Sequence, residues 1–222
     1  MESKKLIIGY WNIRGLVRHV EYVLEYCGAD YETKLYELGD GPDFSKKVWF
    51  DEKFNLGLEF PNLPYVIDGD FTLTETVPVM FYIAEKYKPE LNGETAKEKG
   101  KVKMLMAILH GLKWDLTMHC YRSDDANEGL KLSFEGLENI SKCLGDKDFF
   151  LGDKLSLPDL YIAELIALIK AFDTENTLAE NYPNIDALHK RVDELPEIKA
   201  FLESDRCRDF KFNNKSAKLF PS

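Results

Sequence analysis

The chain has 222 residues, of which 45% are hydrophobic and 31% are charged, as in globular proteins and unlike disordered ones. Its 29 basic and 39 acidic side chains leave a net charge of −10, which argues against a general binder of nucleic acids or of anionic membranes. No apolar run reaches the roughly 18 residues that cross a bilayer, and no signal-peptide core follows the first lysines. We therefore expect neither nucleic acids nor membranes among the partners.

The cysteines and histidines give no sign of disulfides or metal sites. The cysteines are widely spaced without a Cys-x-x-Cys pair, so we expect reduced thiols and a cytoplasmic location: Cys27, Cys120, Cys143 and Cys207. The histidines lack any zinc-binding spacing, so we expect no metal: His19, His110, His119 and His189.

The first ninety residues alternate strand and helix signals. A short apolar and aromatic run over 5–11 predicts a strand. Apolar residues at helical spacing from Leu16 to Cys27 predict a helix that ends at Gly28. A second strand is predicted over 31–38, and this order of elements predicts parallel pairing through a right-handed crossover.

A hairpin and a further helix follow. The runs 65–67 and 71–73 flank the turn sequence Asp-Gly-Asp and predict two antiparallel strands. Thr76 is expected to be the N-cap of a helix over about 77–87. The stretch that precedes the hairpin has no clear period, and only its loop character can be predicted.

The pattern changes after residues 88–95, which contain Pro and Asn-Gly but no period. We place the domain boundary there and predict two domains, 1–91 and 92–222. Beyond it only helical stripes occur, including a run over 160–169 that is apolar on all sides, as in a helix buried within a bundle. Its entrance, residues 156–159, has the pattern of a capping box. The fold class predicted is an α/β domain followed by an all-α domain.

Several places in the first domain could hold a ligand, but local pattern explains each without one. Tyr10 and Trp11 end a strand, where ligands of parallel sheets gather, although the pattern by itself favours core aromatics. Glu75 and Thr76 open a helix, which attracts carboxylates, although an ordinary helix cap is sufficient to explain them. A cis Pro64 would expose the backbone before it to a ligand, but few X-Pro bonds are cis. The remaining three indicate only a loop with a solvated charge pair: Lys46, Trp49 and Lys53.

Residues 9–16 read Gly-Tyr-Trp-Asn-Ile-Arg-Gly-Leu, and residues 49–69 read Trp-Phe-Asp-Glu-Lys-Phe-Asn-Leu-Gly-Leu-Glu-Phe-Pro-Asn-Leu-Pro-Tyr-Val-Ile-Asp-Gly. Both runs closely resemble mu-class glutathione transferases, and the similarity continues through 82–84, 91–95 and Cys120-Tyr121. The resemblance implies a thioredoxin-like domain that binds glutathione and an all-helical domain that contributes the electrophile pocket. The implied activity is conjugation of glutathione to hydrophobic electrophiles, as in detoxification.

The resemblance also assigns roles to residues. Tyr10 would supply the catalytic hydroxyl, Tyr121 would face the electrophile, and Phe60 would insert into the partner subunit of a homodimer. Asn62 and Leu63, ahead of a cis Pro64, would pair with the cysteinyl main chain of glutathione. Glutathione, a co-substrate with no further cofactor, would be held by Trp11, Leu16, Lys46, Trp49, Lys53, Asn62, Leu63, Pro64, Glu75 and Thr76.

Some positions depart from the mu pattern. Glu75-Thr76 stands where the class has Gln-Ser, and Lys46 replaces an Arg or His; these changes keep the polar chemistry, although Lys46 loses the guanidinium fork. An aspartate that the class donates across the dimer aligns with Gly111, so either Asp115 or another acid substitutes, or glutathione binds more weakly. Trp114, near the electrophile pocket, also differs, and the substrate preference therefore stays open.

The expected mechanism makes a thiol nucleophilic at neutral pH. A thiol with a pKa of about 8.5 is only about 3% ionised at pH 7. Lowering that pKa by about two units requires about 2.7 kcal/mol, and one hydrogen bond to a charged partner supplies about 1.5–3 kcal/mol. We therefore expect Tyr10 to stay protonated and to donate to the sulfur. The alternatives are a peroxidase or isomerase that uses the same thiolate, and a non-catalytic carrier or structural protein.

Overall fold

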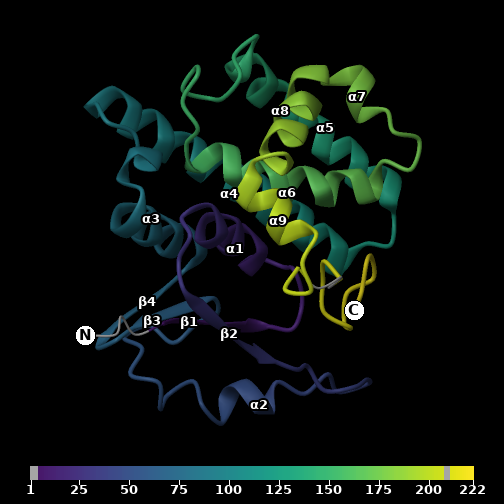
Figure 1. Cartoon of the computed structure of the whole chain (residues 1–222). Coiled ribbons are helices and arrows are strands. Elements are labelled where there is room, and N and C mark those ends of the chain that lie inside the picture. Colours follow the sequence, from purple (N-terminus) through teal and green to yellow (C-terminus); the bar gives the residue numbers. More distant parts are fainter. Residues whose placement is uncertain (1–4, 208–210) are drawn as a thin grey trace.

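The computed structural model describes residues 5–207 and 211–222 (Figure 1). Residues 1–4 of the first predicted domain and 208–210 of the second lie outside the described residues. The described chain forms a small α/β part followed by a larger helical part, which confirms the predicted fold class.

The N-terminal part is built on a four-stranded sheet in the order β2-β1-β3-β4. β1 (Leu6–Trp11) pairs in parallel with β2 (Tyr31–Tyr36), and α1 (Val17–Tyr26) connects the two strands. β3 (Tyr65–Asp68) pairs antiparallel with both β1 and β4 (Phe71–Thr74). The predicted parallel crossover and the predicted hairpin are both confirmed.

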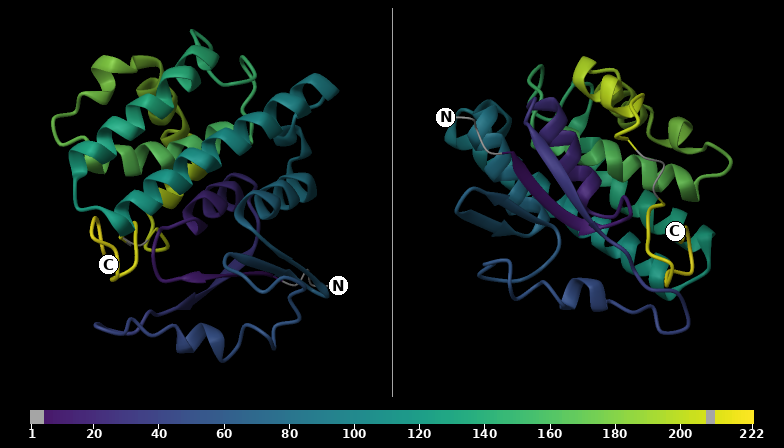
Figure 2. Two further views of the ribbon diagram at one scale, coloured as in Figure 1. Left: turned by 180° about the vertical axis from the view of Figure 1, so that it is seen from behind. Right: turned by 60° about the horizontal axis from the view of Figure 1, so that its bottom comes forward.

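Helices cover both sides of this sheet. α1 and α3 (Thr76–Tyr87) lie between the sheet and the C-terminal helices, whereas α2 (Lys47–Phe50) lies on the opposite side (Figures 1 and 2). The prediction of Thr76 as N-cap is wrong by one residue: Glu75 is the N-cap, with a φ of 74°, and Thr76 is the first helical residue. α2 has only four residues, too few to show a period in the sequence.

The remaining described chain is mainly helical. The 3-10 helix η1 (Pro89–Asn92) contains the predicted domain boundary at 91/92, which stays a prediction. The long helix that follows starts at a capping box formed by Thr95 and Glu98. The helices are α4 (Ala96–Arg122), α5 (Ala126–Leu144), α6 (Leu157–Phe172), α7 (Leu178–Asn181), α8 (Pro183–Asp193) and α9 (Pro196–Leu202).

α6 is the central helix of the molecule. It packs against α1, α3, α4, α5 and α8, and nearly all of its side chains are buried, as its apolar sequence predicts. At its start the Ser156 backbone N–H and hydroxyl both donate to Asp159, at 2.8 and 2.6 Å, which confirms the predicted capping box. α7 and α9 were not among the predicted elements, because four and seven residues carry too little periodicity.

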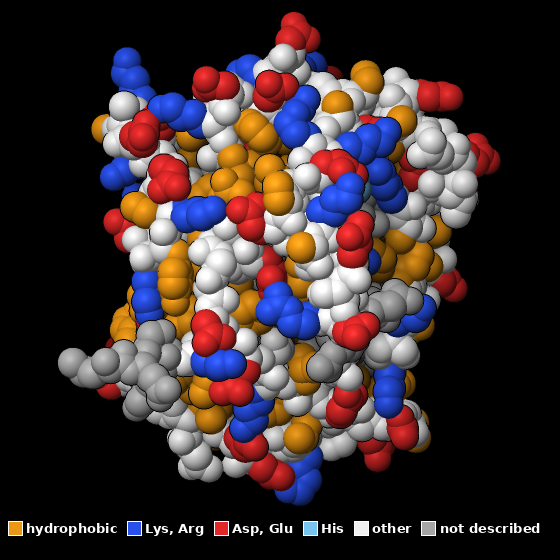
Figure 3. Space-filling model, in the orientation of Figure 1, with side chains coloured by type: hydrophobic (Ala, Val, Ile, Leu, Met, Phe, Trp, Pro, Cys, Tyr) orange, Lys and Arg blue, Asp and Glu red, His pale blue; other side chains and the backbone are white. Residues whose placement is uncertain are grey.

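The face of the molecule shown in Figure 3 carries both signs of charge. On the face in Figure 3, described Lys and Arg side chains alternate with Asp and Glu, and hydrophobic side chains lie between them. In the described parts of the chain, no helix is long and apolar enough to cross a membrane.

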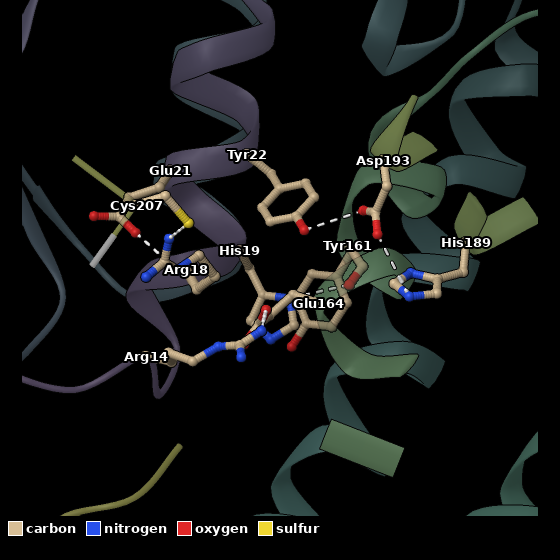
Figure 4. Close-up of polar contacts among 10 residues, drawn as sticks. All are labelled: Arg14, Arg18, His19, Glu21, Tyr22, Tyr161, Glu164, His189, Asp193 and Cys207. Carbon is tan, nitrogen blue, oxygen red and sulfur yellow. Dashed lines mark hydrogen bonds and ion pairs between the residues drawn. The ribbon is translucent and has the colours of Figure 1, made fainter. Parts of the chain in front are cut away.

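Glu21 on α1 is buried beside Arg18, and their Oε2 and Nε atoms lie 3.2 Å apart (Figure 4). Burial raises the pKa of Glu21 from 4.5 to about 7, although Arg18 opposes this. A carboxyl whose pKa is raised by folding stabilises the fold below its unfolded pKa, and this stability is lost as the pH rises through 7.

We therefore expect Glu21→Gln to remove a pH-dependent loss of stability. Between pH 4 and pH 8 the free energy of unfolding of the variant should rise relative to wild type, by about 3 kcal/mol at most. Urea unfolding at both pH values measures this difference. The same pH dependence in both proteins would contradict the assignment.

Candidate active site

A cavity of about 220 Å³ lies where the sheet domain meets the helical part. The cavity is lined by five of the residues to which the resemblance assigns a role in the site: Tyr10, Trp11, Leu16, Lys46 and Tyr121. The other lining residues come from the N-terminal part, from α4 and from the C-terminal segment: Ile13, Gly15, Leu38, Trp114, Thr117, Phe212, Asn213, Asn214 and Ser216. The wall therefore combines three parts of the chain that are distant in sequence.

Tyr10 lies at the end of β1, and its hydroxyl oxygen accepts a hydrogen bond of 3.0 Å from the Leu16 backbone N–H. Burial raises the pKa of Tyr10 above its ordinary value, although the Leu16 N–H opposes this shift, so the phenol is neutral at pH 7. Gly15 permits this approach because a Cβ there would lie 2.6 Å from the Tyr10 ring. The oxygen accepts from Leu16, and its own proton remains available for another acceptor.

Tyr121 lies on the other side of the cavity, on α4. Its hydroxyl accepts a hydrogen bond of 3.0 Å from the Asn214 backbone N–H. Trp114 and Thr117 line the cavity from the same helix, at spacings of seven and four residues from Tyr121. Sequence reasoning singled out Trp114 but missed Thr117, which the helical spacing could have revealed.

The C-terminal segment supplies a wall that sequence reasoning missed. The Lys211 and Phe212 carbonyls accept hydrogen bonds of 2.9 and 3.1 Å from the Arg14 and Gly15 backbone N–H groups. The Lys218 backbone N–H donates to the Cys120 carbonyl at 2.9 Å. These are main-chain contacts without regular secondary structure, so the sequence carries no periodic signal for them.

The residues assigned to the cysteinyl and glutamyl ends form a second group, outside the cavity wall. The Asn62 side-chain amide donates to Glu75 at 2.7 Å, and the Leu63–Pro64 peptide bond is cis. Thr76 is 2% exposed, and its hydroxyl has no hydrogen-bond partner among the described residues. This group offers an exposed carboxylate, a free hydroxyl and the N-terminus of α3.

Trp49 lies in α2 and Lys53 follows it in the chain, and neither lines the cavity. Trp49 is 5% exposed and packs against Tyr36 and Tyr65, with ring centroids 5.2 and 6.1 Å away. The Lys53 ammonium lies 5.8 Å from the Trp49 ring centroid and 5.0 Å from that of Phe54. The structure keeps these two side chains together, and their assigned role in binding glutathione stays a prediction.

The resemblance assigns two further positions to subunit contacts, and these roles stay predictions. Phe60 is 73% exposed, although its side chain is large and apolar. Gly111 faces outward from α4, and a Cβ added there would meet nothing within 4 Å. Within the described ranges, no group of three or more His, Cys, Asp or Glu side chains could hold a metal ion.

Comparisons with known proteins agree with this architecture. The family model described as "Glutathione S-transferase, N-terminal domain" matches residues 7–85, and "Glutathione S-transferase, C-terminal domain" matches residues 104–205. The two models thus cover the sheet domain and most of the helical part, so the chain belongs to the glutathione S-transferase family.

Its relatives include members of the mu class. The chain is 35% identical to Glutathione S-transferase Mu 5 of Rattus norvegicus over 221 residues, which cover 97% of this chain and 96% of the relative. It is 38% identical to Glutathione S-transferase Mu 2 of Macaca fuscata fuscata, over 90% and 92% of the two chains. The crystal structure of the glutathione S-transferase Blo t 8 superposes with a TM-score of 0.78 at 25% identity, over 96% of this chain and 99% of that one. The resemblance found in the sequence is thereby confirmed.

Proposed function

We propose that the protein is a glutathione transferase that joins the thiolate of glutathione to hydrophobic electrophiles, as in detoxification. The observation that carries the proposal is the Tyr10 hydroxyl, a buried, neutral phenol on a cavity wall. Its oxygen accepts from the Leu16 N–H, and its proton has no acceptor among the described residues. The family membership and the names of the mu-class relatives support the reaction type.

The Tyr10 proton would act on the sulfur as a hydrogen-bond donor. A preorganised donor stabilises the thiolate more than the thiol, and thus lowers the pKa of the thiol. The Leu16 N–H lowers the pKa of Tyr10 itself, and a more acidic phenol is a stronger donor. The proton stays on Tyr10 throughout, and the thiol proton leaves to solvent when glutathione ionises.

The other assigned residues would hold glutathione along the edge of the sheet domain. Glu75 would face the γ-glutamyl ammonium, and the unpartnered Thr76 hydroxyl would donate to its carboxylate. The basic side chains of Lys46 and Lys53, with the ring of Trp49, would hold the glycine end. Glutathione would be a co-substrate, and no cofactor would be needed. The electrophile would occupy the side of the cavity formed by Trp114 and Tyr121.

Retention on immobilised glutathione, followed by turnover with a chloronitroaromatic acceptor, tests the proposal. Retention together with conjugation is expected. Retention without turnover of this acceptor, of a hydroperoxide or of an isomerisable substrate would indicate a carrier. Absence of retention would contradict a glutathione site altogether.

We further propose a homodimer in which Phe60 of each subunit inserts into the other. The support is the exposure of large apolar side chains, since such side chains commonly mark protein interfaces: Phe60 is 73% exposed, and Met104 and Ile108 on α4 are 50% and 48% exposed.

Phe60→Ala is expected to shift the dimer toward monomer by at least tenfold in dissociation constant, because it removes a buried aromatic anchor from each half of the interface. Sedimentation over a range of protein concentrations measures the shift. Phe54→Ala is a matched control, since Phe54 is 74% exposed but lies near α2. Equal effects of the two substitutions would contradict a specific role for Phe60.

A cytoplasmic location is part of the same proposal. All four cysteines are unpaired, as in proteins of reducing compartments.

A further inference from the structure

The start of α1 supplies the backbone N–H that donates to the Tyr10 oxygen, but no side chain of this segment caps the helix. Leu16, whose N–H donates to the Tyr10 oxygen, is the N-cap residue, and its side chain makes no capping hydrogen bond. Helix starts of this kind depend on partners outside the helix. The position of this N–H therefore depends on what holds the residues on either side of Leu16.

α6 holds the chain on both sides of Leu16. Before it, Arg14 donates from Nε and Nη2 to the two oxygens of Glu164, at 3.1 and 2.6 Å (Figure 4). After it, the His19 ring stacks on the Tyr161 ring, with centroids 4.0 Å apart and planes inclined by 15°. His19 Nδ1 also lies 3.0 Å from the Tyr161 carbonyl oxygen. Tyr161 and Glu164 are one helical turn apart, so one face of α6 makes both attachments.

His19 is fully buried, and its charge state follows from its surroundings. Burial lowers the pKa of His19 well below its usual value, and the nearby Lys113, His110 and Arg14 lower it further. The hydrogen bond with the Tyr161 carbonyl opposes this shift. The imidazole is therefore neutral, and its Nδ1–H donates to the Tyr161 carbonyl. His19 Nε2 has no hydrogen-bond partner among the described residues, an arrangement that costs stability compared with an apolar side chain.

Tyr161 is itself fixed from a third helix. A hydrogen bond of 2.9 Å joins its hydroxyl to His110 Nδ1 on α4, and the ring is fully buried. Burial raises the pKa of Tyr161, and nearby Tyr10 raises it further, so the phenol is neutral at pH 7. Tyr161 thus links α1, α4 and α6.

We propose that Tyr161, His19 and His110, here called the Tyr161 clamp, are positioning residues for Tyr10. The clamp holds the first turn of α1 against α6 and thereby keeps the Leu16 N–H on the Tyr10 oxygen. This inference rests on the proposed function, because the consequence of the clamp is a stronger hydrogen bond from Tyr10 to the thiolate. The residues assigned to the glutamyl end of glutathione are not members of the clamp, and among them Glu75 acts on the pKa of His110 rather than on His19. A substitution of His19 should therefore affect turnover more than binding.

His19→Leu tests the clamp, since it removes the ring stack and the hydrogen bond while it keeps the site apolar. Three quantities are measured in the full-length protein: the pH titration of the bound thiolate absorbance, kcat and KM for glutathione, and the urea midpoint. We expect the thiolate pKa to rise by about one unit and kcat at pH 7 to fall about threefold, with KM changed less than twofold.

Two other variants separate positioning from stability. Val23→Ala lowers stability in a later turn of the same helix, at a fully buried position outside the clamp, and should leave the thiolate pKa unchanged. His19→Gln keeps an amide donor for the Tyr161 carbonyl and should restore part of kcat; it also provides the comparison with wild type if His19→Leu does not fold.

The outcomes are distinct. A His19→Leu or His19→Gln thiolate titration that matches wild type, with only a lower urea midpoint as in Val23→Ala, overturns the clamp and leaves the proposed function intact. A wild-type protein that shows no bound thiolate and no turnover overturns the proposed function itself.

Discussion

Tyr10→Phe is expected to keep the affinity for glutathione and to lose about 25-fold in kcat at pH 7 with a chloronitroaromatic acceptor. The substitution removes one hydrogen bond to a charged sulfur, which contributes about 1.5–3 kcal/mol, and it leaves the ring and the cavity wall in place. The bound thiol should then ionise close to its free pKa of about 8.5. Stopped-flow turnover and titration of the thiolate absorbance measure the two effects.

Tyr121→Phe is the matched control for this experiment. Tyr121 lines the same cavity, but its oxygen accepts from the Asn214 backbone N–H, and it is assigned to the electrophile side. We expect the thiolate pKa of this variant to stay near that of wild type. A thiolate pKa that is unchanged in Tyr10→Phe would remove Tyr10 from the catalytic role.

Asp159→Ala is expected to lower the free energy of unfolding by at least about 3 kcal/mol. Asp159 is fully buried and accepts from the Phe150 N–H at 2.9 Å as well as from the Ser156 N–H and hydroxyl. Its removal leaves three buried donors without an acceptor, at about 1–3 kcal/mol each before relaxation. Urea unfolding at one fixed protein concentration measures the loss, because dimer formation would make stability depend on concentration.

The other capping box provides the control. Glu98 accepts from the Thr95 backbone N–H at 2.9 Å at the exposed start of α4, where water replaces a lost acceptor. Glu98→Ala should therefore cost only about 1 kcal/mol. If the two substitutions destabilise equally, burial is not the reason for the importance of Asp159.

The length of each local signal explains which elements the sequence predicts. The sheet, α1, α3 and α6 follow from apolar periods, turn sequences and caps, which are local signals repeated over several residues. The four residues of α2 and of α7 are shorter than one clear period, and their helical form depends on packing. The shift of the α3 N-cap from Thr76 to Glu75 has a similar origin, since a φ of 74° at a glutamate is a conformation that local preference does not favour.

The residues of the candidate site also fall into two groups, those that one continuous segment supplies and those that only tertiary contacts bring together. Tyr10, Trp11 and Leu16 lie in one continuous segment, so a resemblance in that segment assigns them together, and the structure places them on one cavity wall. The C-terminal segment was missed because it is attached through main-chain hydrogen bonds, which any side chain permits. His19 and Tyr161 were also missed, because each alone has the pattern of a buried core residue and their contact joins positions 142 residues apart.

The parallel crossover, the hairpin, the buried central helix and the segment that bears the phenol were determined by the sequence itself, because each depends on neighbours along the chain. The tertiary structure decided how the start of α1 is held, which residues from α4 and the C-terminal segment complete the cavity, and which polar groups are buried. These features depend on contacts between distant segments, and such contacts arise only when the helical part packs onto the sheet domain.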